Sequence, residues 1–391
     1  MRTVDRIREL LSPELQDVHK ARLTQVFSVV AGLVRGGRAT VTAIGRAVAT
    51  TTTDKHGIKR VDRCVGNTRL HGERLLFWRA LACTLLAKNP RPCILVDWTD
   101  VGSGYAALRA AVAFRGRALC IFNQVYPARR TGNSNAQGRF LKSLKQVLPT
   151  GCRPIIVTDS GFRGTWFRQL NRLQWDFIGR LLPRVTMRSI LGGPRLKVTD
   201  LQRDAINVCR DCGQFELNQS NRYVGRIVSF DGRSRRAKAS RAPKKRRNDE
   251  NKGAKRAHSP LVLVTSVLDI GAKSVVELYK ARMQIEENFR DDKSPRYGWQ
   301  FEFARSRNRR RLENLLLLIA LATLAAALAG LAVVASNEQR HYQANTVRNR
   351  PVLSIITLGR RVLARLHDIS PPQIALGLRE LRALLLPTYA H

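Results

Sequence analysis

The sequence predicts an α/β protein in which a sheet domain is preceded and followed by helical regions. Residues 1–88 show helical periodicity and no convincing strand. From Pro92 onward, apolar runs rich in β-branched residues alternate with amphipathic segments. The chain has 391 residues, of which 44% are hydrophobic, so it can bury a sizeable core in two or three domains.

The charge of the chain indicates a polyanionic partner. It contains 69 Lys and Arg against 29 Asp and Glu, a formal net charge of +40. Nucleic acid is the leading candidate, because membrane-surface and ribosomal binding usually involve a shorter basic module. The opening "MRTVDRIRELL" reads as an amphipathic helix and not as a signal peptide, so we expect a cytoplasmic, nucleoid-associated bacterial protein.

The N-terminal region, residues 1–88, is predicted to be a helical DNA-binding domain. Helices are expected near residues 3–11, 14–35, 40–50 and 72–87, and "TVTAIGRAVA" followed by "DKHGIKRVDRCVGN" looks like short helices around a turn. Basic side chains of the second stretch are available to DNA phosphates, namely Lys55, Lys59, Arg60 and Arg63. The alternative is that they form only a solvated basic face.

Residues 89–184 predict the first part of a ribonuclease H-like core. "CILVDWTD" is a strand, and "YAALRAAVAF" and "RALCIFNQVYP" form a hairpin through Gly116. A helix, the strand "RPIIVTD", a second helix and the strand "WDFIGRLL" follow. This order matches a ribonuclease H-like sheet that still lacks its closing helix.

Residues 185–270 predict a strand-rich insertion with a cationic loop. Between Arg233 and Arg256 the sequence carries twelve basic residues, which suits phosphate binding better than a merely solvated loop. Cys209 and Cys212 are read as ordinary strand or turn cysteines, with a structural zinc as the minor alternative. The loop residues expected to contact DNA are Lys244, Lys245, Arg246 and Arg247.

Residues 271–336 are expected to supply the closing helices of the core. If "YKARMQIEENFRDDK" is one helix, a single polar stripe lines one side of it: Tyr279, Arg282, Glu286 and Lys293. Glu287 then points away from Glu286. We therefore expect Glu287, Asp291 and Asp292 to be helix-surface or pairing residues.

Three carboxylates are predicted to meet over the sheet. Asp97 lies in the first strand, Asp159 ends the fourth, and Glu286 lies on the closing helix. Three carboxylates about 4 Å apart repel one another by several kcal/mol at an effective dielectric near 20. Divalent cations remove that cost, and oxygen ligands favour Mg²⁺, with Mn²⁺ as a substitute. Two such ions suit phosphoryl transfer.

The apolar stretch of residues 315–335 allows two interpretations. Its 21 residues carry no charge, and a stretch of this length could span a membrane. However, it is rich in Ala, has no aromatic belt and has basic residues on both sides, so we favour a helix buried in a soluble core. Residues 337–391 are predicted to be a helical C-terminal region that could serve dimerisation.

Several motifs together resemble a known family. The spacing of Tyr279, Arg282, Glu286 and Lys293 resembles the YREK signature of the DDE cut-and-paste transposases of bacterial insertion sequences, family four. "KHGIKRVDRCVGN", "ILVDWTD", "VTDSGF" and "HYQANTVRNRPVLS" are similar to the insertion-sequence-ten branch of that family, from about residue 40 to 360.

The resemblance implies roles for the matching residues. Asp97, Asp159 and Glu286 would be the metal-binding triad, and Tyr279, Arg282 and Lys293 would contact the phosphates and the flipped base of the transposon end. It implies strand hydrolysis, hairpin formation, hairpin resolution and joining to target DNA, carried out by a homodimer on inverted-repeat ends.

One position departs from the family pattern, and two other functions stay open. Several relatives have a base-stacking aromatic residue just before the strand that follows the insertion, where this chain has Pro260 and Leu261. A ribonuclease H-like nuclease without strand transfer would share the triad. A non-catalytic DNA-binding protein, or a membrane-tethered one, would not need it.

Overall fold

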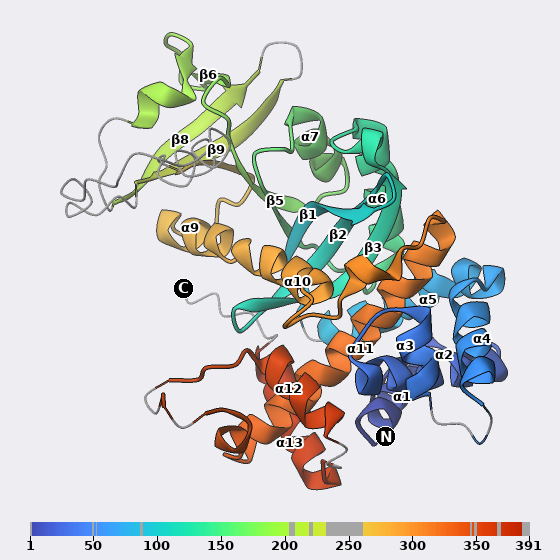
Figure 1. Ribbon diagram of the computed structural model, residues 1–391. Helices are drawn as coiled ribbons and strands as arrows, with labels where there is room; N and C mark the ends of the chain where they lie inside the picture. The colour runs from blue at the N-terminus through green and yellow to red at the C-terminus, as the bar shows by residue number, and fades with distance from the viewer. Residues whose placement is uncertain are drawn as a thin grey trace, which may run out of the picture. The chain divides into compact units, whose positions relative to one another are not determined.

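The computed structural model describes residues 2–48, 51, 53–86, 89–202, 208–218, 222–231, 261–344, 346–347, 350–365 and 369–384. The chain divides into two compact units (Figure 1). The first contains Met1–Cys152 and Met283–Thr388, and the second contains Arg153–Arg282. These two units do not test the division into five segments that the sequence predicts, and that division stays a prediction.

The first unit begins with helices, as predicted. Their bounds are α1 (Arg2–Leu11), α2 (Lys20–Gly36), α3 (Val41–Ala47), α4 (Asp54–Val65) and α5 (Thr68–Leu86). The helix expected from residue 14 starts later, because a 3₁₀ turn covers Ser12–Glu14 and His19 caps α2. The Nδ1 atom of His19 accepts a hydrogen bond from the backbone N–H of Ala21.

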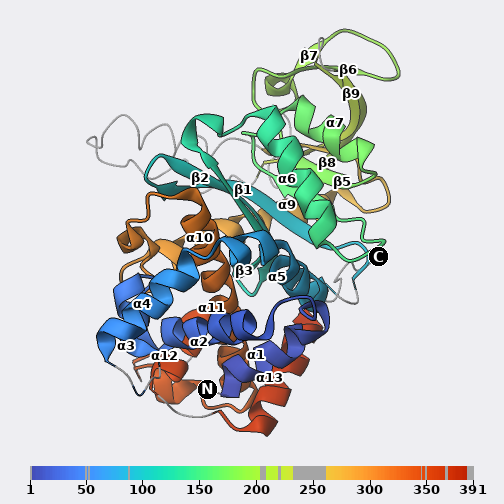
Figure 2. The same ribbon diagram turned by 90° about the vertical axis from the view of Figure 1, so that its right-hand side faces the viewer.

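An antiparallel meander follows, also as predicted. It consists of β1 (Cys93–Gly102), β2 (Tyr105–Phe114) and β3 (Arg117–Pro127), in the order β3-β2-β1. Arg115 and Gly116, which join β2 to β3, have φ values of 43° and 79°, as a tight hairpin turn requires. Helix α6 (Ser134–Val147) packs against β3, and so does α5 (Figure 2).

Helix α11 (Arg309–Ala335) is the core of the first unit. Helices α12 (Ile355–Ala364) and α13 (Pro371–Leu384) lie alongside it in Figures 1 and 2. Among the described residues, α11 is the one helix that is long and apolar enough to cross a membrane. Of its 18-residue apolar segment, 94% is buried inside the protein. The prediction that residues 315–335 form a core helix is confirmed.

Small residues explain why this helix is rich in Ala. A Cβ atom on Gly359 of α12 would overlap the carbonyl oxygen of Ala326, and one on Gly330 would overlap that of Ile355. The backbones of α11 and α12 therefore approach more closely than larger side chains allow. The sequence of α11 suits helix packing inside a protein.

The second unit is a sheet with two described helices. Its strands pair in the order β4-β5-β10-β9-β8-β6-β7, where β4 and β5 are parallel and the other pairs are antiparallel. The strands are β4 (Ile155–Thr158), β5 (Asp176–Arg180), β6 (Thr186–Ser189), β7 (Leu196–Lys197), β8 (Cys209–Leu217), β9 (Tyr223–Phe230) and β10 (Leu261–Thr265). The helices are α7 (Gly164–Arg172) and α9 (Ala272–Lys280). The chain is thus a mixed α/β protein, as the sequence predicts.

The prediction of a single helix over residues 279–293 is wrong. Helix α9 ends at Lys280, and α10 (Met283–Lys293) starts after a turn at Ala281 and Arg282. No Gly or Pro marks this break, so local propensity does not reveal it. Helix α9 packs on strands of the second unit and α10 on the meander of the first, and tertiary packing overrides propensity here.

Candidate active site

Asp97 lies in the middle of β1, in the first unit. The apolar residues before it, Ile94, Leu95 and Val96, are fully buried and fix the strand in the sheet. In the register of the meander, Asp97 is directly opposite Arg109 of β2. Directly opposite residues of antiparallel strands project from the same face, so both side chains share one face of the sheet.

Arg109 connects that face to α10. Its guanidinium Nη2 lies 2.6 Å from Oδ2 of Asp292, and its Nη1 donates a hydrogen bond of 2.6 Å to Oδ1 of Asn288. It also lies over the ring of Phe289, 5.1 Å from the ring centroid. Because Arg109 is only 2% exposed, these contacts stabilise a buried charge and anchor α10 beside the strand of Asp97.

Further contacts hold α10 on the meander. The Oε1 atom of Gln284 accepts hydrogen bonds from the backbone N–H groups of Phe114 and Gly116, at 2.9 and 3.1 Å. Arg117 of β3 contacts Glu287 at 2.6 Å and Asp291 at 3.2 Å. Helix α10 is thus attached through its first and its last turns.

Two acids of α10 differ from the sequence expectation. Asp291 and Asp292 are each 4% exposed, so they are not surface residues, although the expected pairing role is confirmed. Arginines of β2 and β3 make this burial possible, because a buried carboxylate requires a partner. Burial raises the pKa of Asp292, and the contact with Arg109 opposes that rise.

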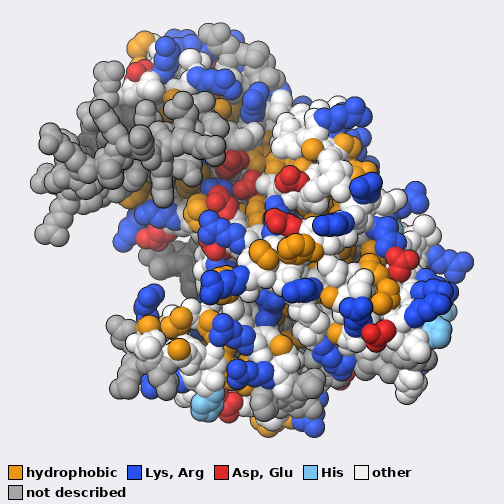
Figure 3. Space-filling model, viewed as in Figure 1, with side chains coloured by type: hydrophobic (Ala, Val, Ile, Leu, Met, Phe, Trp, Pro, Cys, Tyr) orange, Lys and Arg blue, Asp and Glu red, His pale blue; other side chains and the backbone are white. Residues whose placement is uncertain are grey.

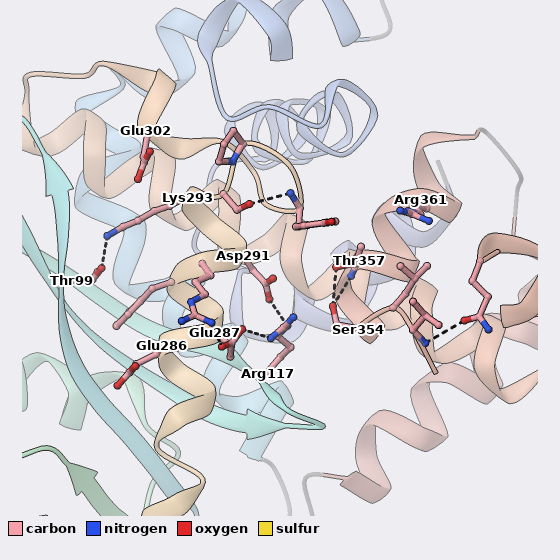
Figure 4. Close-up of a pocket in the computed structure, with 18 of the residues that line it drawn as sticks. Thr99, Arg117, Glu286, Glu287, Asp291, Lys293, Glu302, Ser354, Thr357 and Arg361 are labelled. Carbon is pink, nitrogen blue, oxygen red and sulfur yellow. Dashed lines mark hydrogen bonds and ion pairs between the residues drawn. The ribbon is translucent and has the colours of Figure 1, made fainter. Parts of the chain in front are cut away.

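A cavity of about 1040 Å³ lies beside α10 (Figure 4). Its lining includes Glu286, Glu287 and Lys293 of α10 and residues of the C-terminal region up to Arg361. Figure 4 shows Glu286 and Lys293 on the side of α10 that faces β1, and Glu287 beside Arg117 on the other side. The two neighbouring glutamates therefore have different surroundings.

Lys293 reaches the strand that carries Asp97. Its Nζ atom donates a hydrogen bond of 2.8 Å to Oγ1 of Thr99. Thr99 and Asp97 are two residues apart in β1 and so face the same side of the sheet. Burial lowers the pKa of Lys293, and the charge of Asp100 opposes this effect.

The second unit holds the other residues of the expected site. Asp159 follows the last residue of β4, and its Oδ1 atom accepts a hydrogen bond of 2.9 Å from the N–H of Gly161. Tyr279 is 6% exposed, with the guanidinium carbon of Arg282 6.0 Å from its ring centroid. Burial raises the pKa of Tyr279, whereas Arg282 and Arg180 lower it and Asp159 adds a smaller rise. Asp159, Tyr279 and Arg282 are therefore close enough to influence one another.

The three expected metal ligands are divided between the units. Asp97 and Glu286 belong to the first unit, and Asp159 belongs to the second. Within either unit, the described residues contain no group of three or more His, Cys, Asp or Glu side chains that could hold a metal ion. All three candidates supply carboxylate oxygens, the ligands that suit Mg²⁺ or Mn²⁺.

The basic residues expected to bind DNA lie on the exposed face of α4. Its other face is buried and includes Gly57, where a Cβ atom would overlap the carbonyl oxygen of Gly45 of α3, while a Cβ atom on Gly45 would overlap the backbone of Ile58. Lys and Arg far outnumber Asp and Glu on the face of the molecule in Figure 3. The exposed basic side chains of α4 are Lys55, Lys59, Arg60 and Arg63. The loop residues Lys244, Lys245, Arg246 and Arg247 lie outside the described residues.

Sequence reasoning missed Arg109, Thr99 and Arg117, which hold α10 and Lys293 in place. A signal for Arg109 was present, because it is the one charged residue in the apolar stretch "YAALRAAVAF". A lone charge in a buried strand indicates a buried partner. The cysteines Cys209 and Cys212 both lie in β8, as strand residues.

Carboxylates on a strand and on a helix can hold divalent cations, and the large excess of positive charge suits a nucleic-acid partner, a combination that fits metal-dependent phosphoryl transfer on nucleic acid. Residues 88–324, more than half of the chain, match the family described as "Transposase DDE domain". The chain therefore belongs to the family of DDE transposases. This family implies a DNA substrate, nuclease and strand-transfer chemistry, and divalent metal ions. A comparison with curated proteins found no match.

Proposed function

We propose that this protein is a cut-and-paste transposase of a bacterial insertion sequence, with the YREK signature of family four and similar in type to the insertion-sequence-ten branch. The observation that carries the proposal is the position of the acids. Asp97, Asp159 and Glu286 all fall inside the matched segment, on β1, directly after β4 and on α10. These are the elements from which a ribonuclease H-like core presents its carboxylates.

In this proposal Asp97, Asp159 and Glu286 hold Mg²⁺, for which Mn²⁺ can substitute. The bound ions would stabilise charge on the attacking and leaving oxygens of a phosphodiester. The contacts of Arg109 with α10 keep Glu286 on the meander that carries Asp97. Such fixed geometry matters, because phosphoryl transfer depends on positioning and electrostatics more than on covalent chemistry by the protein.

The reaction would consist of successive phosphoryl transfers at one site. Water attacks the phosphorus at the transposon end and releases a 3′-hydroxyl. That hydroxyl attacks the opposite strand, which forms a hairpin and releases the flanking DNA. Water then opens the hairpin, and the regenerated 3′-hydroxyl attacks a phosphodiester of the target. In each step one P–O bond forms, one breaks, and the leaving oxygen takes a proton.

Other side chains would hold the DNA. Lys293, Arg282 and Tyr279 would contact end phosphates and the flipped base, and burial raises the pKa of Tyr279 above its ordinary value, so its phenol can donate a hydrogen bond. The exposed basic face of α4 and the loop residues Lys244 to Arg247 would bind the inverted repeat. Two copies of the chain would pair the two ends in the synaptic complex.

The experiment that tests this proposal uses a duplex with the inverted repeat, labelled on each strand, and a plasmid target. We expect nicks, hairpins and end-to-target joints with Mg²⁺, and none with EDTA. Nicks without joints would favour a ribonuclease H-like nuclease. Binding of the duplex without any cleavage in Mg²⁺ or Mn²⁺ would favour a non-catalytic DNA-binding protein.

A further inference from the structure

A second cavity, of about 540 Å³, lies in the first unit where the β1–β2 turn meets the segment that follows α10. It shares Lys293 and Glu302 with the larger cavity. Its other lining groups include Asp100, Arg305, Ser306 and Arg307. Lys293 thus borders both the cavity of Glu286 and this smaller one.

The polar groups of the smaller cavity suit an anion. Arg305 and Arg307 are exposed, and within the described part of the chain neither guanidinium has an ion-pair or hydrogen-bond partner. The Oγ atom of Ser306 is buried and likewise has no hydrogen-bond partner among the described residues. Of the two carboxylates, that of Asp100 accepts a hydrogen bond of 2.6 Å from the N–H of Gly102. With Lys293, the cations outnumber the carboxylates by three to two.

The backbone of this segment is strained and firmly held. Gln300 and Arg305, at the two ends of the 3₁₀ turn Phe301–Ala304, have φ values of 58° and 48°. Left-handed residues other than Gly cost energy, and such strain persists where packing enforces it, often at functional sites. Here Phe301 is 3% exposed, and the indole Nε1 of Trp299 donates a 2.9 Å hydrogen bond to Thr323 of α11. The turn therefore fixes the backbone from which the side chain of Arg305 projects.

We propose that this smaller cavity binds a phosphodiester of the DNA backbone, on the strand that continues past Lys293 to Glu286. Guanidinium groups bind phosphate through paired hydrogen bonds, and the Ser306 hydroxyl can donate a further one. As a phosphate contact, the cavity would position the DNA backbone and carry no base-sequence information. This inference rests on the proposed function, since it takes the bound polyanion to be the DNA that is cleaved.

The test compares the double variant Arg305→Ala/Arg307→Ala with a matched control, Arg310→Ala/Arg340→Ala. The control removes the same charge near the two ends of α11 but leaves the cavity lining unchanged. End-duplex affinity is measured over a range of salt concentrations. It is then measured at fixed salt on duplexes in which one phosphate at a time is replaced by a neutral methylphosphonate.

We expect one or two neutralised phosphates near the cleavage site to weaken binding by the wild type and the control about fivefold or more. The same replacements should have no further effect on the cavity variant, and its salt slope should be flatter by about one unit per lost phosphate contact. Ser306→Ala should show a smaller loss at the same phosphate, which keeps the test valid if the double variant folds poorly. An unchanged methylphosphonate profile in the cavity variants would overturn the inference.

Failure of this inference and failure of the proposed function give different results. If the wild type cleaves the end with Mg²⁺ but the profiles of wild type and cavity variant agree, the cavity does not bind a phosphate. If the wild type never cleaves but the profiles differ as expected, the cavity binds DNA and the proposed reaction is wrong.

Discussion

Arg109 has the most consequential contacts of any single residue here, because it is opposite Asp97 in the sheet and contacts the helix of Glu286. Removing one partner of a buried ion pair should cost about 3–5 kcal/mol, so Arg109→Met and Asp292→Leu should each lower the free energy of unfolding strongly. The double variant should recover most of that loss, because it buries two apolar groups instead of one unpaired charge.

Nicking distinguishes a positioning role of Arg109 from a purely structural one. In the refolded double variant we expect nicking to fall about 10- to 100-fold and the Mg²⁺ concentration for half-maximal rate to rise, since Glu286 is held less firmly. End-duplex affinity should stay the same. A double variant with the wild-type rate and Mg²⁺ dependence would show that Arg109 and Asp292 only stabilise the fold.

Asp291 should make the stability of the protein depend on pH. Burial raises its pKa from 3.8 to about 7, although Arg117 opposes the rise. Between these values the unfolded chain is ionised while the folded protein keeps the proton. The contribution of Asp291 to stability is therefore present below about pH 4 and is lost as the pH rises to 7, by up to about 4 kcal/mol.

Asp291→Asn should remove this dependence. Thermal unfolding at pH 4, 5, 6 and 7 should show a smaller decline with rising pH than in the wild type. Asp17→Asn, which changes an exposed carboxylate, serves as the control and should follow the wild-type curve. If the curves of the Asp291→Asn variant and the wild type are parallel, the carboxyl group of Asp291 does not have a raised pKa.

At the scale of elements, the contact between α11 and α12 depends on Gly359. A methyl group there would overlap the carbonyl of Ala326, so Gly359→Ala should cost about 1–3 kcal/mol or more through overpacking. The same substitution at Gly72 of α5 meets open space and should stabilise the helix by up to about 1 kcal/mol. Urea unfolding measures both; equal stability of the two variants would rule out close packing of α11 on α12.

Several elements could be predicted from sequence because local patterns determine them. The hairpin through Gly116 follows from a turn glycine between two apolar runs, and the burial of α11 follows from its Ala-rich composition. The break at Ala281 could not be predicted, because good helix formers surround it and packing in two different units decides it.

The candidate site was predictable to a similar extent. Strand order predicts Asp97 and Asp159 as candidates, but the helical stripe that was expected to join Tyr279 and Arg282 to Glu286 is interrupted, because α9 ends at Lys280 and α10 begins at Met283. The burial of Asp291 and Asp292 was not predictable, because it depends on Arg109 and Arg117, which are more than 170 residues away along the chain. Helical periodicity alone assigns an acid next to a basic residue to the surface.

At the scale of the whole molecule, the net charge of +40 predicts strongly salt-dependent DNA binding, with α4 as a major contributor. Lys59→Ala/Arg63→Ala should weaken binding to the inverted repeat and flatten the salt slope by up to about two units. The control is Lys142→Ala/Lys145→Ala, which removes two exposed charges from α6. Equal slopes for both variants would show that α4 contributes only to the general charge.

The central claim is that Glu286 belongs to the catalytic triad and its neighbour Glu287 does not. Nicking of a labelled inverted-repeat duplex in Mg²⁺ should be measured for the wild type, Glu286→Gln and Glu287→Gln, with duplex binding measured in parallel. Glu286→Gln should bind the duplex at least as tightly as the wild type and produce no detectable nicks, whereas Glu287→Gln should nick within about tenfold of the wild-type rate. Full cleavage by Glu286→Gln would contradict the assignment of the triad and, with it, the proposed function.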